Sequence, residues 1–418
     1  MSQHAAEAQD TPEQHAFRLR ARTYMAEHLP PRLAEEAPWV WDRPELVLKD
    51  RRIQKLLFDG GLAGLTVPVV YGGQGLDPSY EAIFLQEALP YRLAWALGNS
   101  FNVVLPTLLK HASEGLKRRY VPRLLSGEDL WCQLLSEPSG GSDLAGLITR
   151  ATRTEGGWLL NGSKVWTTGG HFADMAICLA RTDPEAPKHA GLTLFLVNMH
   201  APGMTVRPLR LIEGSEDFCQ EFLDDVFVAE DHVVGEVNGG WTVAKTAMAN
   251  EHAAMGRGWH AGYRSGETTN ELAPPEDLLD LAKGRPGDAH VRQLFGEAWV
   301  LDAVQLLTTR RIETGIRAGV LPAQSGHISK VMSAKAGARR TAIVSELAGV
   351  HGIAARPREE GLSAGMNRVI RHAIGGGTTE MSGNTIGERL LGLPPEPLPD
   401  RNIPFSQLAK NAAPKRGG

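Results

Sequence analysis

Residues Trp131–Asp143 read WCQLLSEPSGGSD, and residues Asn161–Asp174 read NGSKVWTTGGHFAD. The first stretch ends in small residues, whose glycines and hydroxyls allow a backbone to approach a ligand closely and to bind an anion. In the second stretch Asn161-Gly162 stands between two apolar runs, a pattern typical of a tight β-hairpin turn. We therefore expect an anion-binding loop beside a β-hairpin, with Trp166-Thr167-Thr168 at a strand end.

Helical and β-rich segments alternate on a larger scale along the chain. Apolar residues recur at spacings of three and four before about residue 127, as in Ile53, Leu56 and Leu57, and the same spacing returns after residue 240. Between these regions, short β-rich runs such as Leu192–Val197 are separated by turn residues. The expected fold class is therefore mainly α with a central β domain.

The change of pattern predicts where the domains begin and end. We expect an N-terminal helical domain over residues 1–127, a central β domain over 128–237 and a C-terminal helical bundle over 238–394. The tail, 395–418, contains several prolines, lysines and glycines and is expected to be poorly ordered.

Composition excludes several classes of protein. The 418 residues carry a net charge of −4 at pH 7, so the sequence lacks the basic surface of a nucleic-acid-binding protein. No apolar run is long enough to span a membrane, and the N-terminus lacks a secretory signal, so we expect a cytoplasmic protein. The three cysteines, Cys132, Cys178 and Cys219, have no metal-binding spacing and are interpreted as small buried residues.

Together with motifs elsewhere, the two opening stretches resemble the acyl-CoA dehydrogenase family over roughly Phe17 to Pro394. The further matching motifs are GLTVP (64–68), YGGQG (71–75), YVPRLLSGE (120–128), FLDDV (222–226), VGEVNGGW (234–241), GGTTEM (376–381) and ERLLGLP (388–394). The resemblance implies an N-terminal helical domain, a middle β-barrel-like domain, a C-terminal four-helix bundle and FAD as the cofactor.

The same resemblance implies roles for individual residues. Those implied to hydrogen-bond the flavin pyrimidine, to face its ring, or to meet phosphate oxygens beside the thioester are Leu134, Leu135, Ser136, Trp166, Thr168 and Ser142. Those implied near the flavin, its adenosine or the acyl-CoA are Gly376, Gly377, Thr378, Glu380 and, across a subunit interface, Gly349. Of the two groups, Ser142, Gly376 and Gly377 also border the substrate. Amides and a threonine hydroxyl suit a reduced anionic ring because they donate hydrogen bonds without titrating.

Several of these residues also have a purely structural explanation. Trp166 is equally typical of a core aromatic, and Thr378 and Glu380 of caps at the start of a helix. Gly349 is also explained as a helix C-terminal cap. Asp143 is expected to cap its own turn by bonding the amides that follow it.

Dehydrogenation of a thioester requires a carboxylate that removes the α-proton. The resemblance places this base either before the Gly-Thr of the C-terminal motif, where this chain has Gly376, or early in the first bundle helix, where it has Glu251. Glycine at 376 leaves room for a carboxylate that arrives from the other side. We therefore predict that Glu251 is the base, although without the resemblance its position is typical of a surface helix residue.

Three departures from the family pattern concern the site. His252 follows Glu251 where arginine is usual, and we expect the field on the base to become pH-dependent. Arg292 has the letters of the family's pyrophosphate-binding segment but lies at the start of the next helix, so we leave it out of the site. Only Gly349 and Gly352 remain of a Gly-Gly-x-Gly turn. Candidates for the acyl-pocket wall, or equally for the core, are Trp259, His260 and Tyr263.

The expected function is FAD-dependent α,β-dehydrogenation of an acyl-CoA to the 2,3-enoyl-CoA. The resemblance implies an electron-transfer flavoprotein as acceptor and a homodimer or homotetramer as the assembly. By analogy the acyl group is branched, cyclic or steroid-derived. Two alternatives stay open: a flavin-dependent monooxygenase or oxidase on the same fold, and a non-catalytic partner subunit of a heteromeric dehydrogenase.

Overall fold

The structure, a computed structural model, describes residues 10–32, 41, 43–212, 214–255, 276–283, 285, 287–349, 371, 373–397 and 402–408. The helices of the N-terminal part are α2 (Pro12–His28), α3 (Pro44–Asp59), α4 (Ser79–Ala88), α5 (Leu105–His111) and α6 (Glu114–Ser126). Those of the C-terminal part are α7 (Gly240–Met255), α8 (Glu276–Ala282), α9 (Ala289–Arg317), α10 (Gly326–Ala348) and α13 (Thr379–Thr385). Among the described helices, none is long and apolar enough to cross a membrane.

Shorter helical segments connect these elements. They are η1 (Val69–Tyr71), η2 (Ser100–Val104), η3 (Leu144–Gly146), η4 (Gly170–Phe172), η5 (Glu230–His232), η6 (Ala323–Ser325), η7 (Ile386–Leu390) and η8 (Phe405–Gln407).

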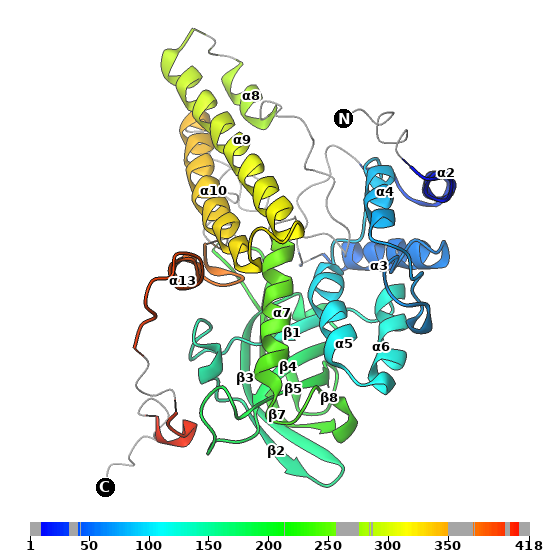
Figure 1. Cartoon of the computed structure of the whole chain (residues 1–418), viewed down its shortest axis with the longest axis vertical. Coiled ribbons are helices and arrows are strands. Elements are labelled where there is room, and N and C mark those ends of the chain that lie inside the picture. Colours follow the sequence, from blue (N-terminus) through cyan, green and yellow to red (C-terminus); the bar gives the residue numbers. More distant parts are fainter. Residues whose placement is uncertain are drawn as a thin grey trace.

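Eight strands form one sheet between the two helical parts. They are β1 (Trp131–Leu134), β2 (Arg150–Thr154), β3 (Gly157–Thr168), β4 (Met175–Arg181), β5 (Leu192–Asn198), β6 (Met204–Leu209), β7 (Phe218–Ala229) and β8 (Val233–Val234). Their order is β6-β7-β3-β2-β4-β5-β8, with β1 beside β4. Only the β1–β4 and β2–β4 pairings among them are parallel. The helical, β-rich, helical order expected from the sequence is therefore present (Figure 1).

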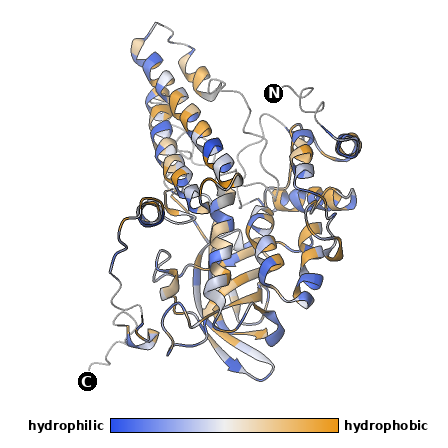
Figure 2. Cartoon of the chain, in the orientation of Figure 1, coloured by the Kyte–Doolittle hydropathy of each residue, from blue (hydrophilic) through white to orange (hydrophobic). Residues whose placement is uncertain are grey.

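Two hydrophobic cores hold the described residues together. The larger core combines side chains of the N-terminal helices, the sheet and the first half of α7, among them Phe84, Leu124, Trp131, Phe195 and Val243. The smaller core lies between α8, α9 and α10, which extend away from the sheet (Figure 1). In Figure 2 the long helices α9 and α10 alternate apolar and polar residues along their length, as expected for helices that bury one face. The three cysteines are buried, as predicted.

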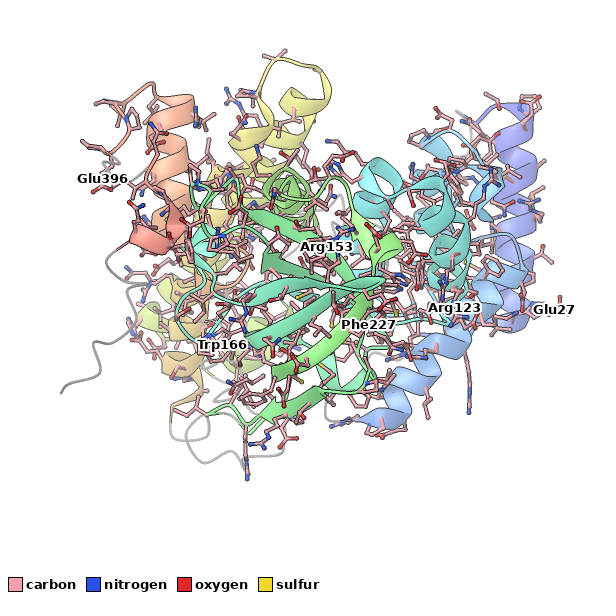
Figure 3. The ribbon with its side chains drawn as sticks, turned by 90° about the horizontal axis from the view of Figure 1, so that it is seen from below. Glu27, Arg123, Arg153, Trp166, Phe227 and Glu396 are labelled. Carbon is pink, nitrogen blue, oxygen red and sulfur yellow. The ribbon has the colours of Figure 1, made fainter. Side chains whose placement is uncertain are left out.

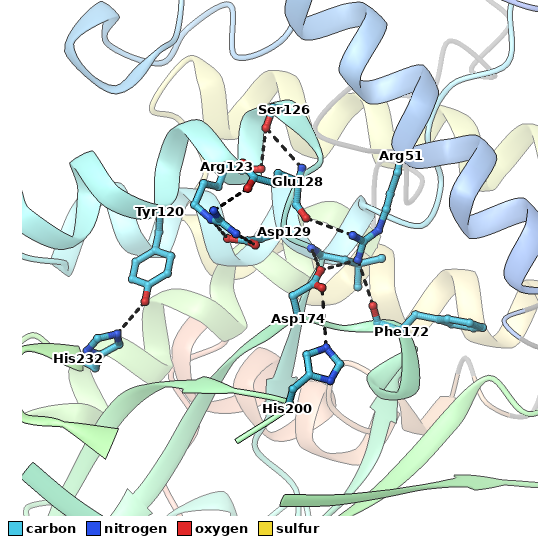
Figure 4. Close-up of polar contacts among 11 residues, drawn as sticks. Arg51, Tyr120, Arg123, Ser126, Glu128, Asp129, Phe172, Asp174, His200 and His232 are labelled. Carbon is cyan, nitrogen blue, oxygen red and sulfur yellow. Dashed lines mark hydrogen bonds and ion pairs between the residues drawn. The ribbon is translucent and has the colours of Figure 1, made fainter. Parts of the chain in front are cut away.

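Polar contacts join α3 and α6 to the sheet (Figure 4). Arg51 of α3 donates to Asp174 Oδ2 at 2.5 Å and to the carbonyl of Phe172 at 3.3 Å. The same Asp174 oxygen accepts a hydrogen bond from the backbone of Leu130 at 2.7 Å. One carboxylate thus connects α3, the start of β1 and the start of β4.

The prediction of a hairpin at Asn161-Gly162 is wrong. Gly157–Thr168 is one continuous strand, β3, and the turn that joins it to β2 lies at Glu155-Gly156. Asn161 instead lies at an irregularity in the pairing with β7, where its side-chain amide donates to Asp225 at 2.8 Å. Glycine is needed at 162 because a Cβ there would lie 2.4 Å from the Thr149 hydroxyl.

Part of the C-terminal tail is ordered, contrary to the prediction. Phe405 is buried against the β domain, and its amide donates to the carbonyl of Ala186 at 3.0 Å. The Arg181 guanidinium lies 3.5 Å from the centre of the Phe405 ring. An aromatic residue within a polar tail thus anchors residues 402–408 to the sheet.

Candidate functional site

Trp166 occupies a strained and exposed position near the end of β3. Its φ is 68°, in the left-handed region, and the pairing of β3 with β7 is irregular between Val165 and Thr167. Its side chain is 58% exposed, so the alternative of a core aromatic is wrong. A non-glycine residue in this region costs on the order of 1–3 kcal/mol and persists where the surrounding structure imposes it, often at functional sites.

The loop of small residues is fastened directly beside this tryptophan. The amide of Val165 donates to the carbonyl of Ser136 at 3.0 Å, so the end of β1 and the end of β3 lie together. Leu134 is buried on β1, whereas Leu135 and Ser136 are half-buried where the loop begins. Thr168, also half-buried, ends β3 opposite Phe218 of β7. The predicted residues Leu135, Ser136, Trp166 and Thr168 therefore belong to one region of the surface.

A buried ion pair holds the loop in place. Lys164 of β3 donates from Nζ to Glu137 Oε1 at 2.9 Å and to the carbonyls of Leu135 and Leu179 at 3.1 and 2.8 Å. Glu137 in turn accepts hydrogen bonds from the amides of Ile148 and Thr149 at 2.7 and 2.9 Å. Burial alone would raise the pKa of Glu137, but Lys164 and these donors outweigh it and lower that pKa. Both ends of the loop are thus attached to one carboxylate.

The exposed part of the same loop carries Ser142 and Asp143. Ser142 is exposed, as a residue that meets a ligand must be. The side chain of Asp143 makes no capping hydrogen bond at η3, so the prediction that it caps its own turn is wrong. Its carboxylate instead lies 3.1 Å from Lys188 Nζ, because the loop folds back towards the segment between β4 and β5.

The strand behind Trp166 carries a buried carboxyl group. Thr167 donates a hydrogen bond to Glu221 Oε2 at 2.7 Å, and the Glu221 side chain is buried. Burial raises the pKa of Glu221 to about 8, more than Thr167 and Lys164 lower it. At neutral pH this carboxyl is therefore mainly protonated and adds little charge behind the tryptophan.

A second group of predicted residues meets at the end of α7. Glu251 and His252 lie in its last turn, half-buried, and a Cβ on Gly377 would lie 3.0 Å from His252 Nε2. The Gly376-Gly377 turn and the predicted base are thus neighbours. Burial raises the pKa of Glu251 to about 7, although Lys330 of α10 opposes this shift.

His252 does not behave as the sequence led us to expect. Burial and the neighbouring His327 lower the pKa of His252 to about 4. The two imidazole rings lie 4.9 Å apart in an edge-on arrangement. His252 is therefore neutral around pH 7, and it does not make the field on Glu251 pH-dependent in that range.

Arg371 connects the two groups. Its guanidinium lies 5.5 Å from the centre of the Phe218 ring, and Phe218 packs edge-on against Trp166 at 6.0 Å. Arg371 also pairs with Asp217 at 2.7 Å, and its carbonyl accepts a hydrogen bond from Gly375 at 2.8 Å. The glycine turn beside Glu251 is thus tied to the strand that precedes Trp166 in the sheet order.

The remaining predicted residues lie apart from this pair of groups or have a structural role. Thr378 is the N-cap of α13 and accepts from the amide of Met381 at 3.1 Å, which confirms the structural explanation, and Glu380 is exposed in the first turn. Gly349, with φ 55°, caps α10 at its C-terminus, also as the structural alternative predicted. It lies about 28 Å along α10 from Lys330, so one chain does not bring it to Glu251. Arg292 lies in the first turn of α9, as expected.

Trp259, His260, Tyr263 and Gly352 lie outside the described residues. His327, Lys330 and Arg371 were not predicted as site residues. His327 and Lys330 stand three apart on α10 and so share one helical face, which was the available signal. No group of three or more potential metal ligands occurs among the residues that the structure describes.

A cavity of about 510 Å³ lies elsewhere, between α6 and the sheet, where Arg119, Tyr120, Arg123, Phe227 and His232 line it. Figure 3 shows Trp166 well separated from Arg123 and Phe227 across the sheet. This cavity is therefore distinct from the region around Trp166.

Comparisons with known proteins agree with this arrangement. The chain matches the family models of the acyl-CoA dehydrogenase N-terminal domain over residues 11–128 and of its middle domain over residues 132–226. It is 30% identical over 389 residues to the acyl-CoA dehydrogenase IpdE1 of Mycobacterium tuberculosis, covering 91% of this chain and 98% of that protein. It is 38% identical over 359 residues to the acyl-CoA dehydrogenase FadE34 of the same organism, covering 83% of this chain. The chain spans 47% of the length of FadE34.

A solved structure titled "Tcur3481-Tcur3483 steroid ACAD" superposes with a TM-score of 0.73 at 25% identity, covering 93% of this chain and 99% of that chain. The fold class expected from the sequence is thereby confirmed. Because two family models match consecutive domains and IpdE1 aligns over nearly its whole length, the chain belongs to the acyl-CoA dehydrogenase family.

Proposed function

We propose that the chain catalyses FAD-dependent α,β-dehydrogenation of an acyl-CoA thioester to the 2,3-enoyl-CoA, with Glu251 as the base that removes the α-proton. The observation that carries the proposal is the position of Glu251, half-buried at the end of α7 beside the Gly376-Gly377 turn. Its pKa, raised by burial to about 7, suits a carboxylate that accepts a proton near neutral pH. Gly376 leaves space beside the base because it has no side chain.

The surface around Trp166 fits a planar aromatic cofactor. The exposed indole and the half-buried hydroxyl of Thr168 stand at the end of β3, next to the loop that starts at Ser136. The residues that would hold FAD are Leu134, Leu135, Ser136, Ser142, Trp166 and Thr168, with Gly376, Gly377, Thr378 and Glu380 on the bundle side. When bound, FAD supplies the acceptor for the β-hydride.

The protein's own part in the reaction is to position the thioester and to move a proton. Glu251 must be ionised before it accepts the α-proton at a carboxylate oxygen, and it is protonated afterwards. Its burial restricts access of water, so the proton comes from the substrate that the site holds. The buried Lys164–Glu137 pair keeps the opposite wall of the site rigid.

Two similar proteins suggest the class of acyl group. FadE34 is 38% identical, and a solved structure of the same fold is titled a steroid ACAD. We infer a branched, cyclic or steroid-derived acyl-CoA, an electron-transfer flavoprotein as the acceptor, and a homodimer or homotetramer.

The test is anaerobic mixing of the purified protein with short, branched, cyclic, steroid-derived and long acyl-CoA thioesters, followed by flavin absorbance. One class of thioester should bleach the flavin. Glu251→Gln should retain the flavin and lose bleaching by orders of magnitude, whereas Glu236→Gln, an exposed glutamate before the same helix, should behave as the parent protein. Undiminished bleaching in Glu251→Gln would exclude this base.

The two alternative functions give different results in the same experiment. A flavin that stays oxidised with every thioester would favour an oxygenase or oxidase. A preparation without flavin would favour a non-catalytic subunit.

A further inference from the structure

Lys330 occupies the junction between the proposed base and the glycine turn. It lies on α10, three residues after His327, and donates from Nζ to the carbonyl of Gly375 at 2.6 Å. The next residues of that turn, Gly376 and Gly377, contact His252, which follows Glu251 on α7. A single ammonium group thus holds the turn on the side from which Glu251 approaches.

The charges around Glu251 among the described residues come from few elements. From α7 itself there is His252, and from α10 there are His327 and Lys330. On the α5 side of α7, His111 donates to or accepts from the Thr246 hydroxyl at 2.8 Å, more than a turn before Glu251. Burial lowers the pKa of all three histidines, so they are mainly neutral around pH 7. Lys330 is the group whose charge acts on the Glu251 carboxyl.

We propose that Lys330 is a positioning residue of the active site: it fixes the Gly375–Gly377 turn through the Gly375 carbonyl, and its positive charge favours the ionised form of Glu251. The inference rests on the proposed function, because it assigns a partner to the proposed base. It explains how a carboxylate beside two neutral imidazoles is kept available for proton removal. It also explains why removal of this charge differs from removal of a surface lysine.

The effect on pH dependence has a definite sign. Glu251 accepts a proton only when it is ionised, so kcat/KM rises with pH through the pKa of this group. A nearby positive charge lowers that pKa. Without Lys330 the rising limb should therefore move to higher pH, and each unit of displacement costs about tenfold in kcat/KM on the acidic side.

The experiment compares kcat/KM against pH for four holoproteins: the parent, Lys330→Met, Lys330→Arg and Lys335→Met. Lys335 is an exposed lysine on the same helix and serves as the matched control. Lys330→Met should lose most activity below neutral pH and recover part of it in alkaline buffer. Lys330→Arg should restore the parent limb, and Lys335→Met should leave it in place. An equal loss at every pH in Lys330→Met would overturn the proposal, because it indicates a structural role alone.

Infrared titration of the Glu251 carboxyl provides a readout that does not depend on turnover. The difference between each protein and its Glu251→Gln counterpart isolates this group, and its midpoint should be higher in Lys330→Met. If Glu251→Gln keeps full turnover, the proposed base is wrong. If Glu251→Gln is inactive while the midpoint and the pH limb of Lys330→Met match the parent, only the role of Lys330 is wrong.

Discussion

At the scale of single residues, Trp166 combines two unfavourable features that a functional role would explain. A left-handed backbone disfavours any residue with a Cβ, and an exposed indole leaves a large apolar surface in water. The hydrogen bond from Val165 to Ser136 and the pairing of Thr167 with Cys219 hold the backbone on both sides. The strain is therefore imposed by the same contacts that bring the loop beside the ring.

We predict that Trp166→Asn separates stability from cofactor binding. Asparagine adopts the left-handed region more easily, so the free energy of unfolding of the flavin-free protein should stay within about 1 kcal/mol of the parent or rise. Flavin retention on gel filtration should fall strongly because the aromatic surface is lost. Phe227→Asn, which removes an exposed aromatic from β7 away from the site, should keep its flavin. Parent-like retention in Trp166→Asn would contradict the assigned role.

At the scale of elements, the Lys164–Glu137 pair decides the position of the loop between β1 and β2. Both side chains are buried, and each makes further hydrogen bonds to the backbone. Removal of one partner leaves a buried charge uncompensated, which typically costs about 3–5 kcal/mol. The exposed Lys188–Asp143 pair on the same loop should contribute much less, about 0–1 kcal/mol.

We predict that Lys164→Met lowers the free energy of urea unfolding by several kcal/mol and weakens flavin binding, because the loop that starts at Ser136 loses its anchor. Lys188→Met is the control and should change stability by less than about 1 kcal/mol. The double variant Lys164→Met/Glu137→Gln should recover part of the lost stability, since no buried charge is then left alone. Equal losses in Lys164→Met and Lys188→Met would show that the buried pair has no special role.

At the scale of the whole molecule, the helices of the C-terminal part leave an apolar surface uncovered within one chain. Val300, Val304 and Leu307 of α9 are each about half exposed, and their spacing places them on one face of the helix. Such a stripe is typical of an interface. The remote position of Gly349, which the resemblance implies at a cofactor site across a subunit boundary, fits the same proposal of an oligomer.

We predict that Val300→Asp dissociates this oligomer, because it buries a charge in an apolar contact. Light scattering should report a lower mass than for the parent protein. Val320→Asp, which replaces an exposed valine beyond the end of α9, should leave the mass unchanged. A parent protein that is monomeric and retains flavin would contradict the oligomer itself.

The residues named as site candidates from sequence were those in contiguous motifs. Ser136, Trp166 and Thr168 lie in such motifs, and the structure brings them together because β1 and β3 are held by one short hydrogen bond and one ion pair. Glu251 was found from its place in the first bundle helix. Lys330 and Arg371 were missed because they belong to segments far along the chain, and their proximity to Glu251 and Trp166 depends on helix packing.

The sequence by itself determined the order of helical and β-rich parts, the family, and the residue types at the site, because periodicity and short motifs are local properties. Tertiary structure alone decided that Asn161-Gly162 lies within a strand, because pairing with β7 and the close approach of Thr149 override a turn preference. It also decided which charges surround Glu251. Those depend on burial and on contacts between α7, α10 and the glycine turn, which no local pattern specifies.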